Sequence, residues 1–255
     1  MDMTGKTVMI TGASRGIGAE TARIFAQNGA NVVLLARSQD AIGDLAGEIG
    51  KQAIAIPCNV ARFGEMSSAV ETAVRAFGGL DVLINNAGGS PPADAATASP
   101  RFSESIIRLN LIAPLVFAQK AYAAMGDGGA IVNIASISGV RPSPGTAAYG
   151  AAKAGLLNLT LSLGQEWAPR VRVNAIIAGL IKTEAADAHY GGAKGIANIE
   201  AELPMKRMAV PADIAQACLF LASPQAGYIT GACLEVHGGG EPPAFLKLAE
   251  EAQKS

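Results

Sequence analysis

The sequence predicts an α/β fold, a doubly wound parallel sheet with helices on both faces. Short apolar runs bounded by glycine alternate with helical patterns of ten or more residues along the chain, which is typical of repeated βαβ units. The apolar runs are continuous rather than alternating, as expected of strands that are buried on both faces. Because βαβ connections are right-handed, successive units predict one twisted parallel sheet.

The expected elements follow one another with no linker and no internal repeat. The stretch 183–210 interrupts their rhythm, because it is rich in Ala and Gly and contains breakers such as Pro204. A long irregular insertion in a compact domain is usually functional, so we expect a substrate lid here within a single domain spanning residues 1–255. The expected strands are 7–11, 31–36, 53–59, 82–86, 130–136, 171–177 and 233–236, and the expected helices are 16–28, 39–49, 63–77, 99–125, 146–167 and 211–222.

Composition and charge exclude several classes of function. The 255 residues carry 20 Lys and Arg against 21 Asp and Glu, which gives no basic surface for nucleic acid or anionic lipid. No apolar run is long enough to span a bilayer, and the first residues lack the pattern of a signal peptide. Cys58, Cys218 and Cys233 lie far apart in apolar stretches, so we expect buried thiols and no metal site. These features predict a cytoplasmic globular protein.

A glycine-rich segment, Thr11-Gly12-Ala13-Ser14-Arg15-Gly16-Ile17-Gly18, follows the first expected strand. Glycines allow a tight turn and a close approach of the backbone to a pyrophosphate. The helix that begins there directs unpaired N–H groups and its positive dipole end at the phosphates. Three glycines can also serve an ordinary turn, but their position between the first strand and the first helix favours a dinucleotide site.

The end of the second expected strand bears on the choice between NAD and NADP. NAD enzymes generally place Asp or Glu there to bind the ribose 2′-hydroxyl. Here Ala36 is followed by Arg37 and Ser38, and no carboxylate appears before Asp40. Arg37, together with Arg15, can pair with a 2′-phosphate, so the sequence favours NADP(H) over NAD(H). The alternative is that both arginines are solvated surface charges.

Three side chains predict proton transfer to or from a substrate oxygen. Tyr149 and Lys153 are four residues apart in an expected helix, which places both on one face. An ammonium close to a phenol stabilises the phenolate, so we expect the pKa of Tyr149 to be lowered towards neutrality. Ser136 ends the preceding expected strand, where open α/β sheets bind ligands, and its hydroxyl can hold a substrate oxygen.

Several independent motifs occur in one order along nearly the whole chain. They are TGASRGIG at 11–18, NNAG at 85–88, Asn110, Ser136, YGAAK at 149–153 and VNAIIAG at 173–179. On these motifs the chain resembles the short-chain dehydrogenase/reductase family. The resemblance implies a single-domain Rossmann fold with a seven-stranded parallel sheet, and an oxidoreductase that uses NAD(H) or NADP(H).

The resemblance also implies residue roles. Tyr149 would be the acid/base, Ser136 would position and polarise the carbonyl, and Lys153 would lower the pKa of Tyr149 and hold the nicotinamide ribose. Asn110 would hold a water that continues the proton relay, although it could instead be a polar residue that kinks a helix. The expected cofactor contacts are Gly12, Ser14, Arg15, Gly16, Ile17, Gly18, Arg37, Ser38, Asn59, Val60, Asn86, Ala87, Gly88, Tyr149, Lys153, Gly179, Ile181 and Thr183.

Three positions depart from the family pattern. Asn59-Val60 replaces Asp-Val after the third strand, where the amide carbonyl can still meet the adenine amino group. Ala178-Gly179 replaces Pro-Gly beside the nicotinamide, which loosens the backbone there. His237 replaces an Asp near the carboxyl end, and we expect it to be a polar turn residue rather than a catalyst. None of these changes touches Ser136, Tyr149 or Lys153, so activity is expected.

The substrate side is expected to comprise residues 89–92, 138–141 and the lid. Most of these residues are small or apolar, which suggests a hydrophobic ketone or secondary alcohol. Arg141, Lys182, Lys206 and Arg207 could instead meet a carboxylate or CoA phosphate, so a 3-oxoacyl-thioester (ACP or CoA) reductase is the alternative. A catalytically silent dinucleotide-sensing protein or a structural partner of a larger assembly is less favoured, since Ser136, Tyr149 and Lys153 are intact.

Two expected helices, 99–125 and 146–167, carry more apolar residues than one sheet-facing stripe needs. A helix that is apolar on more than one side is expected to bury a second face, either against its own neighbours or against another chain. The family resemblance favours pairing across a two-fold axis, so we expect a homotetramer built as a dimer of dimers. In the second helix these residues are Ala151, Ala152, Leu156, Leu157, Leu159, Leu161 and Leu163.

Overall fold

The computed structural model describes residues 1–184, 186–245, 248, 249 and 252, and its centre is one parallel sheet of seven strands. The strand order is β3-β2-β1-β4-β5-β6-β7, which confirms the predicted fold class. The crossover direction reverses between β1 and β4, so the carboxyl ends of these two strands flank a crevice. The strands are β1 (Thr7–Thr11), β2 (Asn31–Ala36), β3 (Ala53–Pro57), β4 (Leu80–Asn85), β5 (Met125–Ile134), β6 (Val171–Ala178) and β7 (Cys233–Val236).

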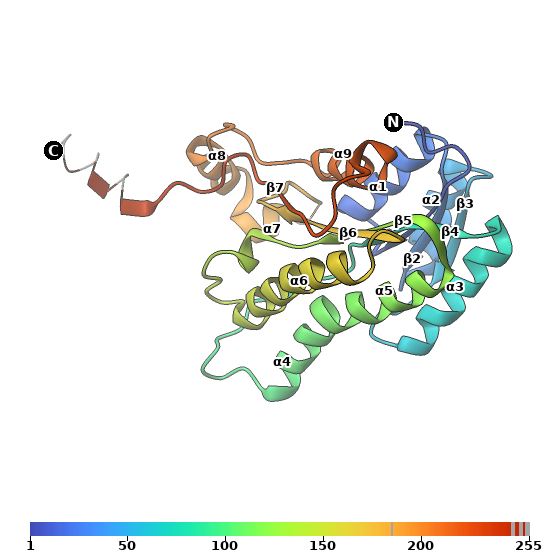
Figure 1. Ribbon diagram of the computed structural model, residues 1–255. Helices are drawn as coiled ribbons and strands as arrows, with labels where there is room; N and C mark the ends of the chain where they lie inside the picture. Colours follow the sequence, from blue (N-terminus) through green and yellow to red (C-terminus); the bar gives the residue numbers. More distant parts are fainter. Residues whose placement is uncertain (185, 246–247, 250–251, 253–255) are drawn as a thin grey trace.

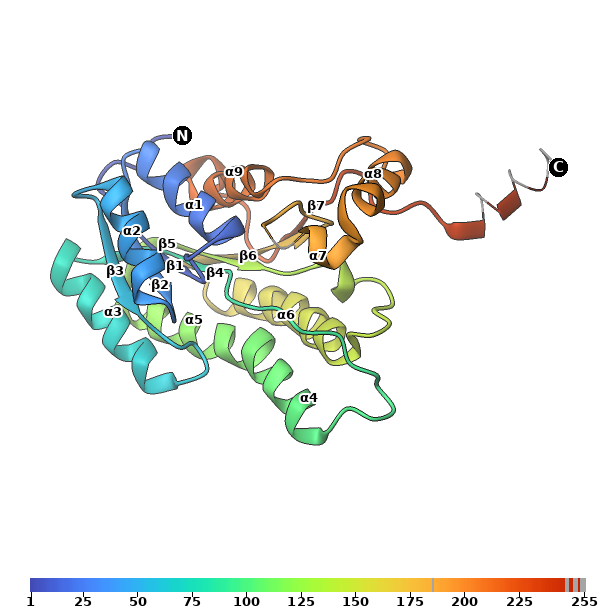
Figure 2. The same cartoon turned by 180° about the vertical axis from the view of Figure 1, so that it is seen from behind.

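Helices form a layer on each face of the sheet (Figure 1). On one face α1 (Gly16–Gln27), α2 (Gln39–Ile49) and α9 (Pro211–Ala222) bury a core with the strands. On the other face α3 (Phe63–Phe77), α5 (Ala113–Ala124) and α6 (Ala147–Glu166) bury a second core, and Figure 2 shows the same two layers from behind. The strands are continuously apolar because both of their faces are covered.

The segment 99–125, predicted as one helix, is interrupted in the middle. It contains α4 (Pro100–Ile107), a π-helical turn over Arg108–Ile112, and α5, and it gives way to β5 at Met125. The N-terminus of α4 is capped in the usual way: the Ser99 hydroxyl accepts a hydrogen bond from the Phe102 N–H at 3.2 Å, and Pro100 occupies the first turn. The π turn lies at Asn110, and such turns often occur at functional sites.

The stretch 183–210 is helical where the sequence predicted irregular structure. It contains α7 (Ala186–Tyr190) and α8 (Gly192–Glu202), while position 185 lies outside the described residues. Three apolar residues, Ile196, Ile199 and Leu203, recur at helical spacing and pack into a small cluster of their own. The abundance of Ala and Gly in this segment concealed that pattern.

Strand ends differ from the expected ones in a way that matters for the site. β3 ends at Pro57 and β5 ends at Ile134, each two residues earlier than predicted, and β4 ends at Asn85 rather than Asn86. Asn59, Asn86 and Ser136 therefore lie just beyond their strands, in the loops at the carboxyl edge of the sheet.

Two further sequence predictions concern the cysteines and the membrane. Cys58 and Cys218 are buried and Cys233 is half-buried, and burial raises the pKa of Cys58 to about 11 and that of Cys218 to about 12. Both thiols stay protonated at neutral pH, which fits the predicted buried role. Within the described ranges, no helix combines the length and apolarity needed to cross a bilayer.

Candidate active site

The glycine loop between β1 and α1 has a backbone that requires glycine. Gly12 and Gly16 have φ values of 68° and 54°, in the left-handed region that side chains rarely adopt. A Cβ at Gly18 would collide with the Gly12 carbonyl oxygen and lie 2.7 Å from Asn86 Nδ2. The loop and the first turn of α1 therefore pack backbone against backbone, which is the close approach expected of a pyrophosphate cradle.

The N-terminus of α1 already binds a carboxylate. Arg15 at the N-cap makes no side-chain capping bond, and the Gly16 N–H donates instead to Glu184 Oε1 at 3.2 Å. Glu184 comes from the loop after β6, far away in the sequence. An anion is therefore bound at the N–H group where a cofactor phosphate is expected, so the loop fits a dinucleotide pyrophosphate, and the two anions would compete for this donor.

Asn86 and Thr11 join the carboxyl ends of β4 and β1. Asn86 Nδ2 donates to the carbonyl oxygens of Thr11 at 2.9 Å and Gly12 at 3.2 Å. In return, Thr11 Oγ1 accepts from the backbone N–H groups of Asn86 and Ala87, both at 2.9 Å. Asn86 thus holds the glycine loop in place from beside the expected adenine-ribose site. The supporting role of Thr11 was not predicted from the sequence.

The side chains at the ends of β2 and β3 suit the adenosine half of a dinucleotide. Ala36 is buried, whereas Arg37, Ser38 and Arg15 are exposed. In the described part of the chain neither arginine has a carboxylate partner within ion-pair distance. Asn59 Oδ1 accepts from the Ala61 N–H at 3.0 Å and keeps a second lone pair for an adenine amino group.

Ser136, Tyr149 and Lys153 lie together at the carboxyl edge of the sheet. Lys153 Nζ is buried, donates to the Ile134 carbonyl oxygen at 2.7 Å, and lies 5.6 Å from the centre of the Tyr149 ring. Burial lowers the pKa of Lys153 to about 8. Burial also raises the pKa of Tyr149, and the hydrogen bond with the Ser136 hydroxyl acts in the opposite direction. The expected lowering of the Tyr149 pKa is not observed, because desolvation of the phenol dominates.

Asn110 lies fully buried in the π turn and anchors the loop after β4. Its Oδ1 accepts from the Gly89 N–H at 2.9 Å, and its Nδ2 donates to the carbonyl oxygens of Gly89 and Ile106, both at 2.9 Å. A Cβ at Gly88 would lie 2.6 Å from Asn110 Oδ1 and 3.4 Å from Lys153 Nζ. The side chain of Asn110 therefore brings the Gly88-Gly89 backbone next to Lys153.

The loop after β6 crosses from the catalytic side to the glycine loop. A Cβ at Gly179 would lie 2.5 Å from the Cβ of His237, so glycine is needed there. Ile181 is buried and pairs with Ala209 in an isolated parallel bridge, and Thr183 lies beside Gly16. His237 Nε2 lies 2.9 Å from Glu235 Oε2, and His237 is not among the described residues that line the cavity beside Tyr149.

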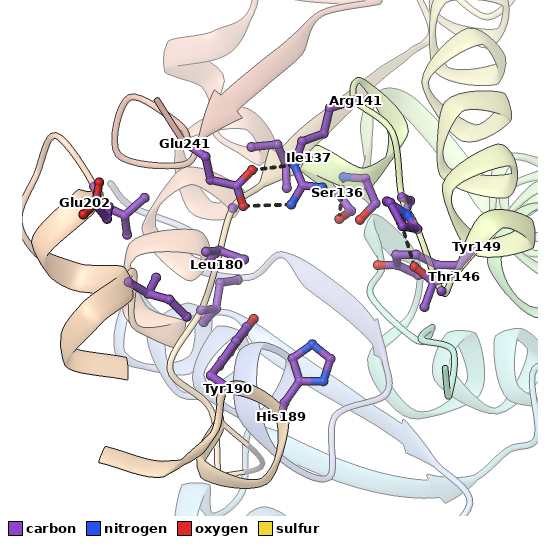
Figure 3. A pocket seen from close by; sticks show the side chains of 18 of the residues that line it. Ser136, Ile137, Arg141, Thr146, Tyr149, Leu180, His189, Tyr190, Glu202 and Glu241 are labelled. Atoms are coloured by element: carbon purple, nitrogen blue, oxygen red, sulfur yellow. Dashed lines mark hydrogen bonds and ion pairs between the residues drawn. The ribbon is translucent and has the colours of Figure 1, made fainter. Parts of the chain in front are cut away.

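A cavity of about 1640 Å³ opens beside Ser136 and Tyr149 (Figure 3). As predicted, its lining includes the loop after β4, the segment around Ser138 and Arg141, and the insertion with α7 and α8. One part of the wall, the segment 241–244 after β7, was not predicted from the sequence. His189 and Tyr190 belong to the predicted lid, and their rings meet edge to face with centroids 4.6 Å apart.

The four cations proposed as contacts for a charged substrate are separated by the structure. Arg141 lines the cavity and is paired with Glu241. Arg207 binds Asp213 through two contacts of 2.6 and 2.9 Å, and Lys206 Nζ donates to a carbonyl oxygen on α8 at 2.7 Å. Lys182 is exposed and does not line the cavity. Only Arg141 is therefore placed to meet a bound substrate.

Comparisons with known proteins agree with this geometry. A family model described as enoyl-(acyl carrier protein) reductase matches residues 12–241. An uncharacterized short-chain type dehydrogenase/reductase of Sinorhizobium fredii is 36% identical over 92% of this chain. The matched region covers 43% of the length of that longer protein. A 3-oxoacyl-[acyl-carrier-protein] reductase of Rickettsia felis is 37% identical over 94% of this chain and 98% of its own.

The structural comparison gives the same answer. The crystal structure of a short-chain dehydrogenase/reductase, glucose/ribitol dehydrogenase, from Brucella melitensis superimposes with a TM-score of 0.89 at 29% identity, over 94% of this chain and 98% of that one. The sequence motifs, the strand order and these relatives all indicate the same family. The chain belongs to the short-chain dehydrogenase/reductase family and is an NAD(P)-dependent oxidoreductase that acts on CH–OH or C=O groups.

Proposed function

We propose that this enzyme transfers a hydride between NADP(H) and a hydrophobic ketone or secondary alcohol. The observation that supports this most directly is the cavity itself, which joins Ser136 and Tyr149 to walls of mainly small and apolar residues. Neutral carbonyl compounds suit such a wall because burying an unpaired charge there is costly. The insertion with α7 and α8 lines one side of the cavity, and we assign it the role of substrate lid.

Each catalytic side chain has a role that its position supports. Ser136 Oγ and the Tyr149 hydroxyl would hold the substrate oxygen, and Tyr149 would donate the proton in reduction or accept it in oxidation. Lys153 donates one hydrogen bond to Ile134, which leaves two N–H groups for ribose hydroxyls. Asn110, fixed in the π turn, would hold the relay water that returns the proton. When bound, the nicotinamide supplies or accepts the hydride at the substrate carbon.

The direct test is an absorbance assay for NADPH or NADH oxidation against a panel of alicyclic ketones. We expect turnover with apolar cyclic ketones and a preference for NADPH. Absence of turnover across the panel, in either direction and with either cofactor, would contradict the proposal.

A second candidate is reduction of a 3-oxoacyl thioester, which the name of the Rickettsia relative favours. Arg141 and Arg207 are each bound to a carboxylate, which counts against a CoA substrate because these carboxylates compete with its phosphates. Acetoacetyl-CoA added to the same ketone panel separates the two. A kcat/KM for the thioester far above that for every ketone would favour the second candidate.

Arg37→Asp is expected to shift cofactor preference towards NAD by about 10–100-fold. The substitution removes a partner of the 2′-phosphate and adds a carboxylate that repels it, and hydrogen bonds to charged groups contribute about 1.5–3 kcal/mol. The measurement is the ratio of kcat/KM for NADPH and NADH. Arg75→Asp, at an exposed arginine of α3, controls for the change in net charge. A parent enzyme that already prefers NADH would contradict the assignment.

We also propose a homotetramer in which α4, α5 and α6 face a second copy. Of the apolar residues predicted to need cover on α6, the chain buries Ala152, Leu156 and Leu163 itself but leaves Ala151 and Leu161 exposed. Light scattering at micromolar concentration is expected to give a particle of four chains. A particle of 25.8 kDa would show that these residues face solvent in a monomer.

A further inference from the structure

Two segments separated by 100 residues meet in an ion pair at the wall of the cavity. Arg141 lies between β5 and α6, and Glu241 follows β7 (Figure 3). Arg141 Nη2 donates to Glu241 Oε1 at 2.8 Å, and Nε lies 2.6 Å from Oε2 in a second ionic contact. Nη1 donates to the Pro142 carbonyl oxygen at 2.9 Å. Hydrogen bonds from two nitrogens, Nη1 and Nη2, fix the guanidinium plane more firmly than a single bond does.

The pair neutralises the positive charge of the cavity wall. Among the described lining residues Arg141 is the only Lys or Arg, whereas carboxylates are supplied by both Glu202 and Glu241. A carboxylate that enters the cavity therefore meets no unpaired Lys or Arg among the described lining residues, because Arg141 is already bound to Glu241. Since each side chain of the pair is only about a third exposed, water screens this charge less than at an open surface.

The pair also lies close enough to the reacting groups to act on a substrate held there. Burial raises the pKa of Tyr190 on α7, Tyr149 and Glu241 raise it further, and Arg141 lowers it. Tyr190 therefore lies within electrostatic reach of the pair and of the catalytic phenol. Tyr149, Tyr190, Arg141 and Glu241 line one cavity, so a substrate bound at Tyr149 shares that cavity with the pair.

We propose that Glu241 sets the charge selectivity of the substrate cavity by holding Arg141 in this ion pair. The enzyme then accepts neutral carbonyl compounds and rejects analogues that carry a carboxylate, because the guanidinium that would recognise a carboxylate is occupied by one from the chain itself. This inference rests on the proposed carbonyl reductase function and names its substrate class. Releasing Arg141 is expected to convert rejection into recognition.

The test compares a matched pair of probes, 4-oxocyclohexanecarboxylate and its methyl ester, which differ in charge but share the reacting ketone. The wild-type kcat/KM is expected to favour the ester. Glu241→Gln keeps the shape of the side chain and frees Arg141, so it is expected to raise the acid-to-ester ratio of kcat/KM about 10–100-fold. The double variant Glu241→Gln with Arg141→Met is expected to lose that gain.

Glu202→Gln is the matched control, because it removes one negative charge from the same cavity without releasing Arg141. Its acid-to-ester ratio is expected to stay near the wild-type value. An equal shift in both single variants, or a wild-type enzyme that prefers the acid, would overturn the proposal.

If neither probe is reduced, the proposed function fails. The role of Glu241 in charge selectivity is then tested separately, by measuring the binding of a carboxylate. Calorimetry of the cofactor-loaded protein with cyclohexanecarboxylate is then expected to show at least roughly tenfold tighter binding by Glu241→Gln than by wild type. Equal affinities would refute it.

Discussion

Tyr149→Phe is expected to lower kcat by about 10²–10⁴-fold while the dissociation constant of the cofactor stays nearly unchanged. The phenol is the group that the site offers for proton exchange with a substrate oxygen, and Ser136 acts to lower its pKa against the effect of burial. Phenylalanine keeps the buried ring and its packing near Lys153, so the loss is confined to the proton. Steady-state kinetics with the best ketone of the panel, together with fluorescence titration of NADPH, measures both quantities.

Tyr190→Phe is the matched control for this experiment. It removes the other phenol that lines the cavity, from α7 rather than from α6, and it is expected to lose far less turnover. If Tyr149→Phe keeps its turnover, or if both variants lose the same amount, Tyr149 is not the acid/base.

The parts of the site that could be predicted from the sequence depend on local spacing. Tyr149 and Lys153 lie on one face of α6 because four residues make about one helical turn. Gly12, Gly16 and Gly18 follow a buried strand and open a helix, so their conformation is set within eight residues. The position of Ser136 at the carboxyl edge of the sheet could be predicted because it closely follows a single buried strand. In each case nearby residues determine both the conformation and the chemistry.

The parts that could not be predicted depend on contacts between distant segments. Nothing near Glu241 in the sequence indicates Arg141, and nothing near Gly16 indicates Glu184, since both pairs form only when the sheet brings loop ends together. The π turn at Asn110 interrupts a stretch whose composition favours a helix throughout. The expected fall in the Tyr149 pKa ignored desolvation, which depends on tertiary packing around the ring.

Lys153→Met is expected to lower turnover by at least about 10²-fold and yet to stabilise the fold. Burial lowers the pKa of Lys153 to about 8, from the value of 10.5 that a solvated lysine has. This difference in pKa means that burying the charged Lys153 lowers the free energy of unfolding at neutral pH by about 3 kcal/mol. Methionine has no charge to desolvate, but it gives up the bond to the Ile134 carbonyl oxygen, which offsets about 1–2 kcal/mol. The net gain in the free energy of unfolding at pH 7 is about 1–2 kcal/mol.

The pH dependence identifies the cause of that gain. Between pH 8 and 10.5 the unfolded chain binds a proton at Lys153 that the folded chain has released, so this lysine's contribution makes the wild type more stable as pH rises. The advantage of Lys153→Met should therefore be largest at and below pH 7 and should shrink towards pH 10. Urea unfolding at both pH values measures it, with Lys51→Met at an exposed lysine between α2 and β3 as the control. An advantage that does not change with pH would mean that packing, rather than a buried ammonium, separates the two proteins. A variant that is more stable but inactive would show that the buried ammonium of Lys153 lowers the stability of the fold. The enzyme would then keep this charge because the chemistry at Tyr149 requires it.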